Sequence, residues 1–373
     1  MSNKSKIHGG RQSGRDGVLI CGAYGLGNAG DEAILEAIVG EMRAIDADMP
    51  ITVISRRPDE TAERLKVESV HTFDLLGFLR AMRRSALYIN GGGSLIQDVT
   101  SRRSLWYYLF SIAAAKILGC SVIMYGCGIG PVLFPYNRRL VRRVLNRFVD
   151  TITLREESSL QELRNFGVTK PETILSSDPA LSLPEADADE VERCMLDLGL
   201  TPGGNYAVFM LRRWKGFNER AEHFADAARY LYETYNLTPV FLSINHQNDG
   251  EATDMAVKDL SGIPTFIIRE PMSTGLAIGL IARMRVAVSM RLHGLIFAES
   301  RGVPTIGIGY DPKVVAFLDY IGNDLYLRLE DVTAEALRPL LDEAMRRERS
   351  MARVEELRVV EQRNVDAARR LLI

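Results

Sequence analysis

A cation and a titratable imidazole stand two residues apart where an apolar run ends in the second half of the chain. Residues 286–288 form the run, which is typical of a buried parallel strand, and Arg291 and His293 follow it. Gly294 then opens a helical pattern. Ligands of open α/β sheets bind at the carboxyl ends of strands, and helix N-termini attract anions. The pattern therefore favours a site for an anion that also exchanges a proton. The alternative is that Arg291 pairs with a local carboxylate and His293 is a core histidine.

The next apolar run ends in a second set of polar residues. Residues 304–309 lead into Tyr-Asp-Pro-Lys at 310–313, which places Lys313 beyond the end of that strand. Neighbouring parallel strands end at the same edge of a sheet, so we expect Lys313 and Arg291 to share that edge. This repetition favours a site over the packing alternative.

Residues 25–30 match the G-x-G-x-x-G pattern of a dinucleotide-binding loop. The second strand, however, ends in Ser-Arg-Arg at 55–57 and lacks the carboxylate that binds the ribose of NAD. NAD is therefore disfavoured, whereas arginines at this position leave NADP open. We interpret the loop as a contact for a sugar or an acceptor diphosphate, with Asn28 and Asp31 as hydroxyl ligands. Asp31 as a simple helix cap is the alternative.

A second glycine-rich segment, Asn-Gly-Gly-Gly-Ser at 90–94, brings bare backbone to the same predicted edge. Asn90 and Gly92, together with Gln97 and Asp98, would suit the hydroxyl groups of a sugar acceptor. A turn without ligands is the alternative. Asp31 and Asp98 are also the candidates for a general base.

Arg155 directly follows the apolar run 151–154, at the carboxyl end of another predicted strand. It adds a third cation, suited to bidentate binding of a carboxylate or phosphate. Pairing with the adjacent Glu156 or Glu157 is the alternative.

Short apolar runs alternate with helical patterns along both halves of the chain. The alternation predicts a parallel sheet covered by helices in each half. The predicted strands are 18–23, 51–54, 86–89, 121–125 and 151–154, then 206–211, 239–244, 265–268, 286–290 and 305–308.

Two successive doubly wound units predict an α/β, GT-B-like architecture, in which two Rossmann-like domains face a central cleft. Strand-like patterning lapses after Asp178-Pro179, and the acidic stretch 183–189 resembles a linker. We therefore expect a disordered tail at 1–16, an acceptor domain at 17–182 and a donor domain at 183–373. The last of these includes charged helices at 334–346 and 352–372.

The composition of the chain argues against several classes of protein. The chain has 373 residues and a formal net charge of −2, which argues against general nucleic-acid binding. Its four cysteines, Cys21, Cys120, Cys127 and Cys194, lack Cys-x-x-Cys spacing, so neither a metal site nor a disulfide framework is indicated. Scattered thiols of this kind fit a reducing cytoplasm.

The sequence predicts no membrane-spanning helix but contains basic and aromatic segments that could contact a membrane surface. The longest apolar stretch, 105–118, is short and contains Ser111 and Lys116, so it predicts a buried helix. Arg102 and Arg103 precede a cluster of aromatic residues, and a predicted helix at 136–148 carries five arginines. A solvated basic face is the ordinary explanation. Peripheral contact with the inner face of the cell membrane is the functional one.

Five segments in this order resemble the polysaccharide pyruvyl transferase family. They are Gly-Leu-Gly-Asn-Ala-Gly-Asp-Glu at 25–32, Asn-Gly-Gly-Gly-Ser at 90–94, Leu-Arg-Glu-Glu-Ser at 154–158, Arg-Leu-His-Gly at 291–294 and Tyr-Asp-Pro-Lys at 310–313. The resemblance extends from Val18 to Phe317. It is closest to the CsaB-type branch, which modifies cell-wall polymers.

The resemblance implies an enzyme that uses phosphoenolpyruvate as donor and forms a pyruvate ketal on a sugar, with release of phosphate. Arg155, Arg291 and Lys313 would bind the donor's anionic groups, and Gly294 would line the donor site. His293 would either protonate the methylene carbon or stabilise the departing phosphate. No cofactor or metal is implied.

The CsaB-type branch implies N-acetylmannosamine in a lipid-diphosphate-linked disaccharide as the acceptor. The pathway would be secondary cell-wall polymer or exopolysaccharide biosynthesis, which serves S-layer anchoring. Two alternatives stay open at this point. One is a GT-B glycosyltransferase that uses a nucleotide sugar, and the other is a non-catalytic protein that binds glycans or anions.

Overall fold

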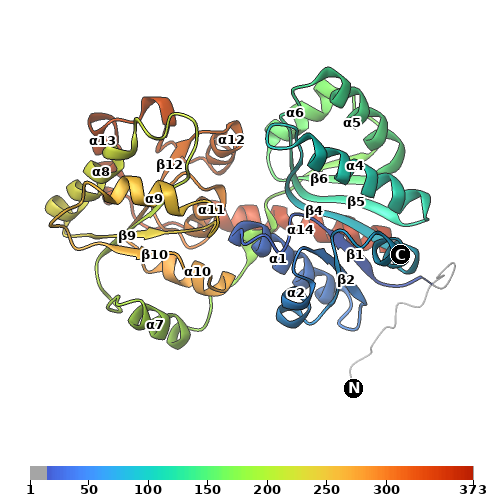
Figure 1. The fold of residues 1–373 in the computed structure, drawn as a ribbon, viewed down its shortest axis with the longest axis horizontal. Helices are drawn as coiled ribbons and strands as arrows, with labels where there is room; N and C mark the ends of the chain where they lie inside the picture. The colour runs from blue at the N-terminus through green and yellow to red at the C-terminus, as the bar shows by residue number, and fades with distance from the viewer. Residues whose placement is uncertain (1–14, 373) are drawn as a thin grey trace. The chain divides into compact units, whose positions relative to one another are not determined.

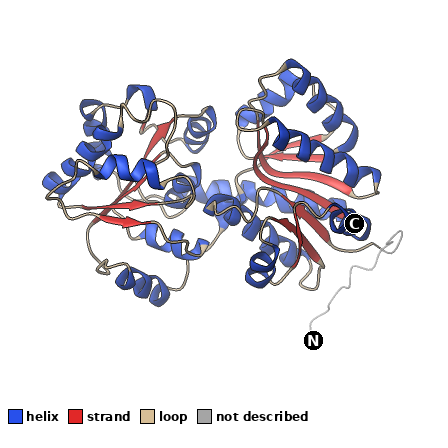
Figure 2. Cartoon of the chain, in the orientation of Figure 1, coloured by secondary structure: helices blue, strands red, loops and turns tan. Residues whose placement is uncertain are grey.

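The structure, a computed structural model, describes residues 15–372, and these fall into two compact units. The first unit comprises 15–26, 34–179 and 360–372 of the described residues, and the second comprises 27–33 and 180–359. Figure 2 shows the strands of each unit between helices. The predicted tail at 1–16 lies almost entirely outside the described residues.

The first unit contains a seven-stranded parallel sheet in the order β3-β2-β1-β4-β5-β6-β7. Its strands are β1 (Val18–Cys21), β2 (Ile51–Ser55), β3 (Glu68–His71), β4 (Leu87–Ile96), β5 (Ser121–Ile129), β6 (Thr151–Leu154) and β7 (Glu172–Leu175). Its helices are α1 (Ala29–Ile45), α2 (Pro58–Leu65), α3 (Leu75–Arg84), α4 (Arg102–Ile117), α5 (Pro135–Phe148), α6 (Glu157–Phe166) and α14 (Ala352–Leu372), of which α1 and α14 extend into the second unit.

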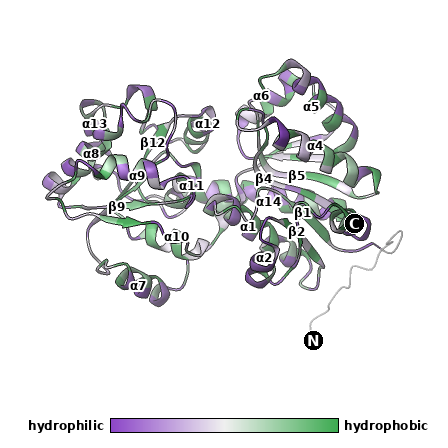
Figure 3. Ribbon diagram, viewed as in Figure 1, coloured by the Kyte–Doolittle hydropathy of each residue, from purple (hydrophilic) through white to green (hydrophobic). Residues whose placement is uncertain are grey.

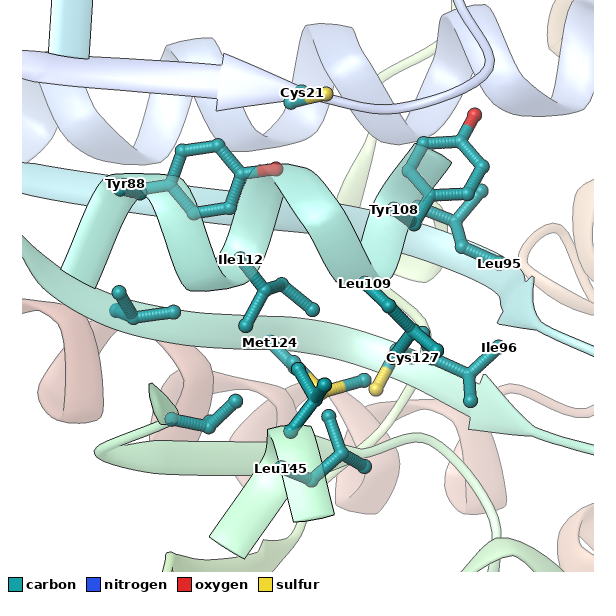
Figure 4. Close-up of a cluster of buried hydrophobic side chains, with 14 of the residues drawn as sticks. Cys21, Tyr88, Leu95, Ile96, Tyr108, Leu109, Ile112, Met124, Cys127 and Leu145 are labelled. Carbon is teal, nitrogen blue, oxygen red and sulfur yellow. The ribbon is translucent and has the colours of Figure 1, made fainter. Parts of the chain in front are cut away.

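Helices cover both faces of this sheet, which explains why its central strands are apolar on both sides. One hydrophobic cluster joins the sheet to α3, α4, α5 and α6, and its members include Tyr88, Ile112 and Leu145 (Figures 1 and 4). A second cluster joins the opposite face to α1 and α14. Apolar contacts on both faces therefore hold the strands, and the residues that follow them, in place.

The second unit contains a six-stranded parallel sheet in the order β10-β9-β8-β11-β12-β13. Its strands are β8 (Tyr206–Met210), β9 (Thr238–Leu242), β10 (Phe266–Ile268), β11 (Val286–Ser289), β12 (Thr305–Gly309) and β13 (Tyr326–Arg328). Its helices are α7 (Ala188–Asp197), α8 (Ala221–Tyr235), α9 (Gly250–Val257), α10 (Thr274–Ala282), α11 (Leu292–Glu299), α12 (Pro312–Ile321) and α13 (Ala334–Arg346), with short 3-10 turns η1 (Pro179–Ser182) and η2 (Leu329–Asp331).

Each sheet has the strand order of a doubly wound dinucleotide-binding fold, in which the chain reverses its direction of growth once. The reversal lies between β1 and β4 in the first sheet and between β8 and β11 in the second. Crevices for ligands open at the carboxyl ends of the strands at this point. The residues that follow these four strands are therefore the first to consider for a site.

The grouping of residues differs from the sequence boundaries at two places. The end of α14, from Val360 onward, belongs to the first unit, where Ala367 and Ala368 are buried in the same apolar cluster as Ile20 and Tyr125. Residues 27–33 group with the second unit, where Ala29 N donates to Ile244 O at 2.9 Å.

The glycine-rich segment predicted at 90–94 is part of a strand, and a neighbouring strand also continues through glycines. β4 runs through Asn90–Ser94 to Ile96, and β5 runs through Gly126 and Gly128 to Ile129. The pairing continues irregularly, with a register shift between Gly93 and Ile96. Gly92 has a φ of 54°, and a Cβ there would lie 2.0 Å from Ile34 Cγ2 of α1. Glycine at this position thus lets a left-handed backbone pass close to α1.

Replacing Gly92 by alanine should destabilise the protein. The added methyl would meet Ile34, and its backbone would be strained, at a cost of about 1–3 kcal/mol from overpacking alone. Gly40→Ala on α1 is the matched control: nothing lies within 4 Å of its Cβ position, and helix propensity predicts a gain of about 1 kcal/mol. Urea unfolding of both variants checks this, and equal midpoints would contradict it.

Candidate functional site

The reversal point of the second sheet carries the Arg291–Gly294 motif. β11 pairs with β8 so that Ser289 lies opposite Met210, and Arg291 follows as the residue that precedes α11. The Ser289 hydroxyl accepts from Arg291 N at 3.0 Å and donates to Arg291 O at 2.9 Å, which turns the chain sharply into the helix. A Cβ on Gly294 would lie 2.6 Å from Ser289 Oγ, so Gly294 allows close packing beneath this turn.

Arg291 forms a buried ion pair with Asp249, its Nη2 donating to Asp249 Oδ1. The other carboxylate oxygen accepts from Ile244 N at 3.1 Å and Asn245 N at 2.7 Å. Both carboxylate oxygens of Asp249 thereby accept hydrogen bonds. Arg291 Nε, in contrast, is buried without a hydrogen-bond partner within the described part of the chain. The guanidinium therefore retains one N–H donor that the described part of the chain does not use.

His293 is buried in the first turn of α11, beside the segment 27–33. A Cβ on Gly30 would lie 2.0 Å from His293 Nδ1, so only glycine allows this close approach of the backbone to the imidazole. Asn28 Nδ2 donates to Asp31 Oδ2 at 2.5 Å, and Gly30 N donates to Asn28 Oδ1 at 3.3 Å. The structure thus brings both predicted hydroxyl ligands into the unit that holds His293.

Lys313 lies in the first turn of α12, directly after the neighbouring strand β12. Its backbone N donates to the capping Asp311 Oδ1 at 3.1 Å, and its ammonium Nζ lies 3.7 Å from Asp311 Oδ2. Pro312 occupies the first helical position, where a missing N–H costs nothing. The lysine is therefore positioned by its helix start and only loosely held by its carboxylate neighbour.

An aromatic and cationic cluster lies beside this motif. The rings of Trp214 and Tyr310 have their centroids 5.0 Å apart, and the Arg212 guanidinium lies over both, 4.8 Å and 5.1 Å from the centroids. Arg212 Nη1 also donates to the Tyr310 hydroxyl at 2.7 Å. A cavity of about 290 Å³ opens here, and its lining residues are Trp214, Lys215, Gly216, Glu219, Arg220, Tyr310, Leu329 and Glu330.

In the first unit, Asn90 occupies the reversal point. It pairs in register with Cys21, the last residue of β1, and its side chain is 1 % exposed. Neither its amide nitrogen nor its amide oxygen has a hydrogen-bond partner among the described residues. A buried amide normally satisfies both groups, so Asn90 is a candidate for contact with a ligand.

The other residues predicted for the acceptor are engaged with the protein. Asp98 accepts from Leu133 N at 2.6 Å, Phe134 N at 3.2 Å and Asn137 Nδ2 at 2.8 Å. The Gln97 side-chain oxygen accepts from Val99 N at 2.8 Å and closes the loop before α4. These contacts explain both residues by local structure, as Gly92 is explained by its packing.

Arg155 is buried, and each of its three side-chain nitrogens donates a hydrogen bond. Nε donates to Glu156 Oε2 at 2.8 Å, Nη1 to Asp178 Oδ2 at 2.9 Å and Nη2 to Ser94 Oγ at 3.2 Å. Burial alone would lower the pKa of Arg155, but the carboxylates of Glu156 and Asp178 outweigh it and raise the pKa above its ordinary value. Arg155 thus carries a fixed positive charge. Its three nitrogens all donate to the protein, whereas Nε of Arg291 has no partner among the described residues.

Sequence reasoning missed Asp249, Asn245 and Trp214. Asp249 and Asn245 belong to the polar run that follows the strand predicted at 239–244, and Trp214 follows the strand predicted at 206–211. The rule applied to Arg291, that side chains beyond a strand's carboxyl end line the ligand edge, would have selected all three.

The described residues do not indicate a thiol nucleophile, a metal site or a membrane-spanning helix. Burial raises the pKa of Cys127 to about 12, so its thiol is neutral and a poor nucleophile. No group of three or more His, Cys, Asp or Glu residues within 15–372 is arranged to hold a metal ion. Over the same range, no helix is both long and apolar enough to span a bilayer.

Three solved structures illustrate the fold. HepE from Anabaena, solved with UDP and glucose, has a TM-score of 0.62 at 10% identity, covering 95% of this chain and 99% of that one. A UDP-GlcNAc 2-epimerase from Methanocaldococcus jannaschii has a TM-score of 0.62 at 11% identity, covering 92% and 98%. A glycosyltransferase from Rickettsia africae has a TM-score of 0.56 at 11% identity, covering 96% of each chain.

At such identities the likeness concerns the fold alone. It confirms the predicted α/β, GT-B-like class, with two parallel sheets. No curated protein matches the chain in sequence.

The sequence profile of one family matches the chain over residues 28–312. This range begins at Asn28, contains Asn90, Arg155 and Arg291–Gly294, and ends one residue before Lys313. It covers well over half of the chain. The chain therefore belongs to the polysaccharide pyruvyl transferase family.

Proposed function

We propose that this protein transfers the enolpyruvyl group of phosphoenolpyruvate to a sugar and closes a pyruvate ketal, with release of phosphate. The observation that carries the proposal is the strand-end constellation of the second unit. A buried arginine with an open Nε, an imidazole in the first turn of a helix and a lysine at the next strand end follow adjacent strands.

This constellation suits the charge of the donor. Phosphoenolpyruvate carries a carboxylate and a phosphate close together, so its binding requires more than one cation. Arg291 offers a directional N–H and Lys313 a compact charge at the same edge. The N-terminus of α11 adds the positive end of a helix dipole.

The chemistry needs one proton to be delivered to carbon. Protonation of the methylene carbon of phosphoenolpyruvate makes the enol carbon electrophilic, and a sugar hydroxyl then adds to it. The C–O bond to phosphate breaks, a second hydroxyl of the sugar adds at the same carbon, and both hydroxyl protons pass to the medium or to phosphate. His293 would deliver the first proton or stabilise the departing phosphate.

On the acceptor side, the structure favours Asn90 over the other candidates. Its buried and unpartnered amide offers a donor and an acceptor to sugar hydroxyls. Asn28 and Asp31, which belong to the second unit, stay candidates for contacts with sugar hydroxyls, and Asp31 is the candidate base. The cavity beside Trp214 and Tyr310 has room for one sugar ring.

The finer identity of the acceptor follows from the CsaB-type resemblance. We propose N-acetylmannosamine within a lipid-diphosphate-linked disaccharide, used for cell-wall polymer or exopolysaccharide synthesis at the inner face of the membrane. This extends the family assignment to a substrate, a pathway and a location.

The donor decides between this proposal and a nucleotide-sugar glycosyltransferase. With a lipid-diphosphate disaccharide present, phosphoenolpyruvate should give phosphate and a product heavier by one pyruvate ketal, whereas UDP-sugars should give no product. Phosphate release and product mass measure both reactions. Transfer from a UDP-sugar without reaction of phosphoenolpyruvate would contradict the proposal, and ligand binding without either reaction would favour a non-catalytic protein.

Replacing His293 by glutamine should slow chemistry more than binding. Glutamine keeps polarity but cannot deliver a proton near neutral pH, so the single-turnover rate should fall by about 10²–10⁴-fold while donor affinity stays close to normal. His71→Gln on the edge strand β3 is the control and should leave both quantities unchanged. A normal rate with weakened affinity would make His293 a phosphate ligand.

Replacing Arg291 by lysine should weaken use of the donor without unfolding the protein. The charge beside Asp249 is kept, but the directional Nε–H is lost, which should cost at least roughly tenfold in kcat/KM for phosphoenolpyruvate. The control is Arg213→Lys, which affects an exposed arginine paired with Glu251 in the same unit. Equal effects of the two replacements on kcat/KM would show that Arg291 does not touch the donor.

A further inference from the structure

One stretch of the first unit carries a charge opposite to that of the rest of the chain. Residues 99–149 contain eight Lys and Arg residues and no Asp or Glu. The whole chain has a net charge of −2, so +8 in this stretch leaves −10 for the remaining residues. A reversal of this size points to an anionic partner at this place in particular.

The arginines of this stretch face outward and are not neutralised. All seven are exposed, and none forms an ion pair with a carboxylate of the described residues; they are Arg102, Arg103, Arg138, Arg139, Arg142, Arg143 and Arg147. Lys116 differs, because its Nζ pairs with Asp150 Oδ2 at 2.6 Å. Asp98 bonds inward, as described above. The nearest carboxylates in the sequence therefore do not cancel the positive surface.

Large apolar side chains are exposed among these arginines. Trp106 and Phe110 lie one turn apart on α4, and Leu133, Phe134 and Tyr136 lead into α5. Arg102 ties the two helices together, with its guanidinium 5.2 Å from the Phe134 ring centroid and its Nη1 donating to the Tyr136 hydroxyl at 3.1 Å. Trp106 Nε1 donates to Asn137 Oδ1 at 2.9 Å.

These contacts join α4 and α5 into one amphipathic surface, and Figure 1 shows the two helices side by side over β4–β6. Figure 3 shows hydrophilic and hydrophobic residues interspersed along it. We call it the α4–α5 surface.

We propose that the α4–α5 surface binds the face of an anionic lipid bilayer. Exposed arginines would attract acidic headgroups, at roughly 1 kcal/mol for each basic residue near the surface. Phe110, Leu133 and Phe134 would enter the boundary between headgroups and acyl chains, and Trp106 and Tyr136 suit the same depth because each ring has one polar atom. A soluble polyanion would use the arginines but would gain nothing from the exposed leucine and phenylalanines.

The α4–α5 surface lies near the edge of the first sheet where ligands would bind. α4 and α5 begin where β4 and β5 end, so Arg102 and Phe134 lie at the carboxyl edge of the first sheet. Asn90 lies within β4, and Arg155, which follows β6, donates from Nη2 to Ser94 Oγ of β4 at 3.2 Å. A bilayer at this surface would present a lipid-linked saccharide to that edge. The binding itself does not depend on the proposed reaction.

Flotation with vesicles tests the proposal on the full chain. Wild-type protein should float with vesicles of phosphatidylcholine and phosphatidylglycerol at low salt, and should not float with phosphatidylcholine alone. Arg139→Gln/Arg143→Gln should lower the partition coefficient by roughly tenfold or more, because two headgroup contacts are lost. Leu133→Ser should cause a smaller, several-fold loss that persists at 0.5 M salt, where arginine contacts are screened.

Matched controls come from the second unit. Arg193→Gln/Lys258→Gln removes the same number of exposed charges, and Leu196→Ser removes a leucine that is 61% exposed, against 55% for Leu133. Neither control should change flotation. Urea midpoints and phosphate release with a water-soluble acceptor should be the same in all variants, so loss of flotation cannot be traced to unfolding.

Three outcomes would overturn the proposal. One is equal flotation of wild type and Arg139→Gln/Arg143→Gln. The second is binding to polyphosphate or heparin without binding to vesicles, which would make the surface a polyanion site. The third is unchanged flotation of Leu133→Ser at both salt concentrations, which would remove the apolar part of the contact.

Discussion

The buried carboxylate of Asp249 holds the ligand edge of the second unit in shape. One oxygen fixes the loop after β9 through two backbone N–H groups, and the other fixes Arg291 after β11. Ile244 O in that loop accepts from Ala29 N at 2.9 Å, which anchors the segment that carries Gly30 against His293. A single charge therefore connects three segments far apart in the sequence. Burying it is costly, and the cost is offset only if every contact forms together.

Both units place an arginine just beyond a strand and hold it by buried carboxylates, yet the two arginines differ in the donors that stay without a partner. Arg155 donates hydrogen bonds to the protein from Nε, Nη1 and Nη2, whereas Nε of Arg291 has no partner among the described residues. A guanidinium bonded through every nitrogen contributes a fixed charge, whereas one with an unpartnered Nε–H also contributes a direction for a hydrogen bond. Electrostatic preorganisation of this kind needs no metal ion to attract an anion.

The sequence predicted the interior strands well because they are continuous apolar runs, as at 286–290 and 121–125. It missed β3, β7 and β13, which lie at or near sheet edges, are only partly buried and begin with residues such as Glu68 and Glu172. The positions of Arg291 and Lys313 at strand ends were predictable, because each directly follows a recognisable apolar run. The engagement of Asp98 with Asn137 was not, because it joins residues that only the folded sheet brings together. The extension of β4 through its glycines was also hidden, since glycine usually signals a turn.

The return of α14 to the first unit bears on the order in which the protein can be made. Ala367 and Ala368 complete the apolar layer on one face of the first sheet, and Asn364 Nδ2 donates to Ser177 O at 3.1 Å. Ribosomes add these residues after 180–359, so the second unit has its own strands before the first has all of its core. Domains usually fold in the order of synthesis. In this protein the first unit cannot complete its core until α14 has been synthesised. One face of its sheet stays partly uncovered until then, and an exposed apolar face of this kind is what chaperones bind.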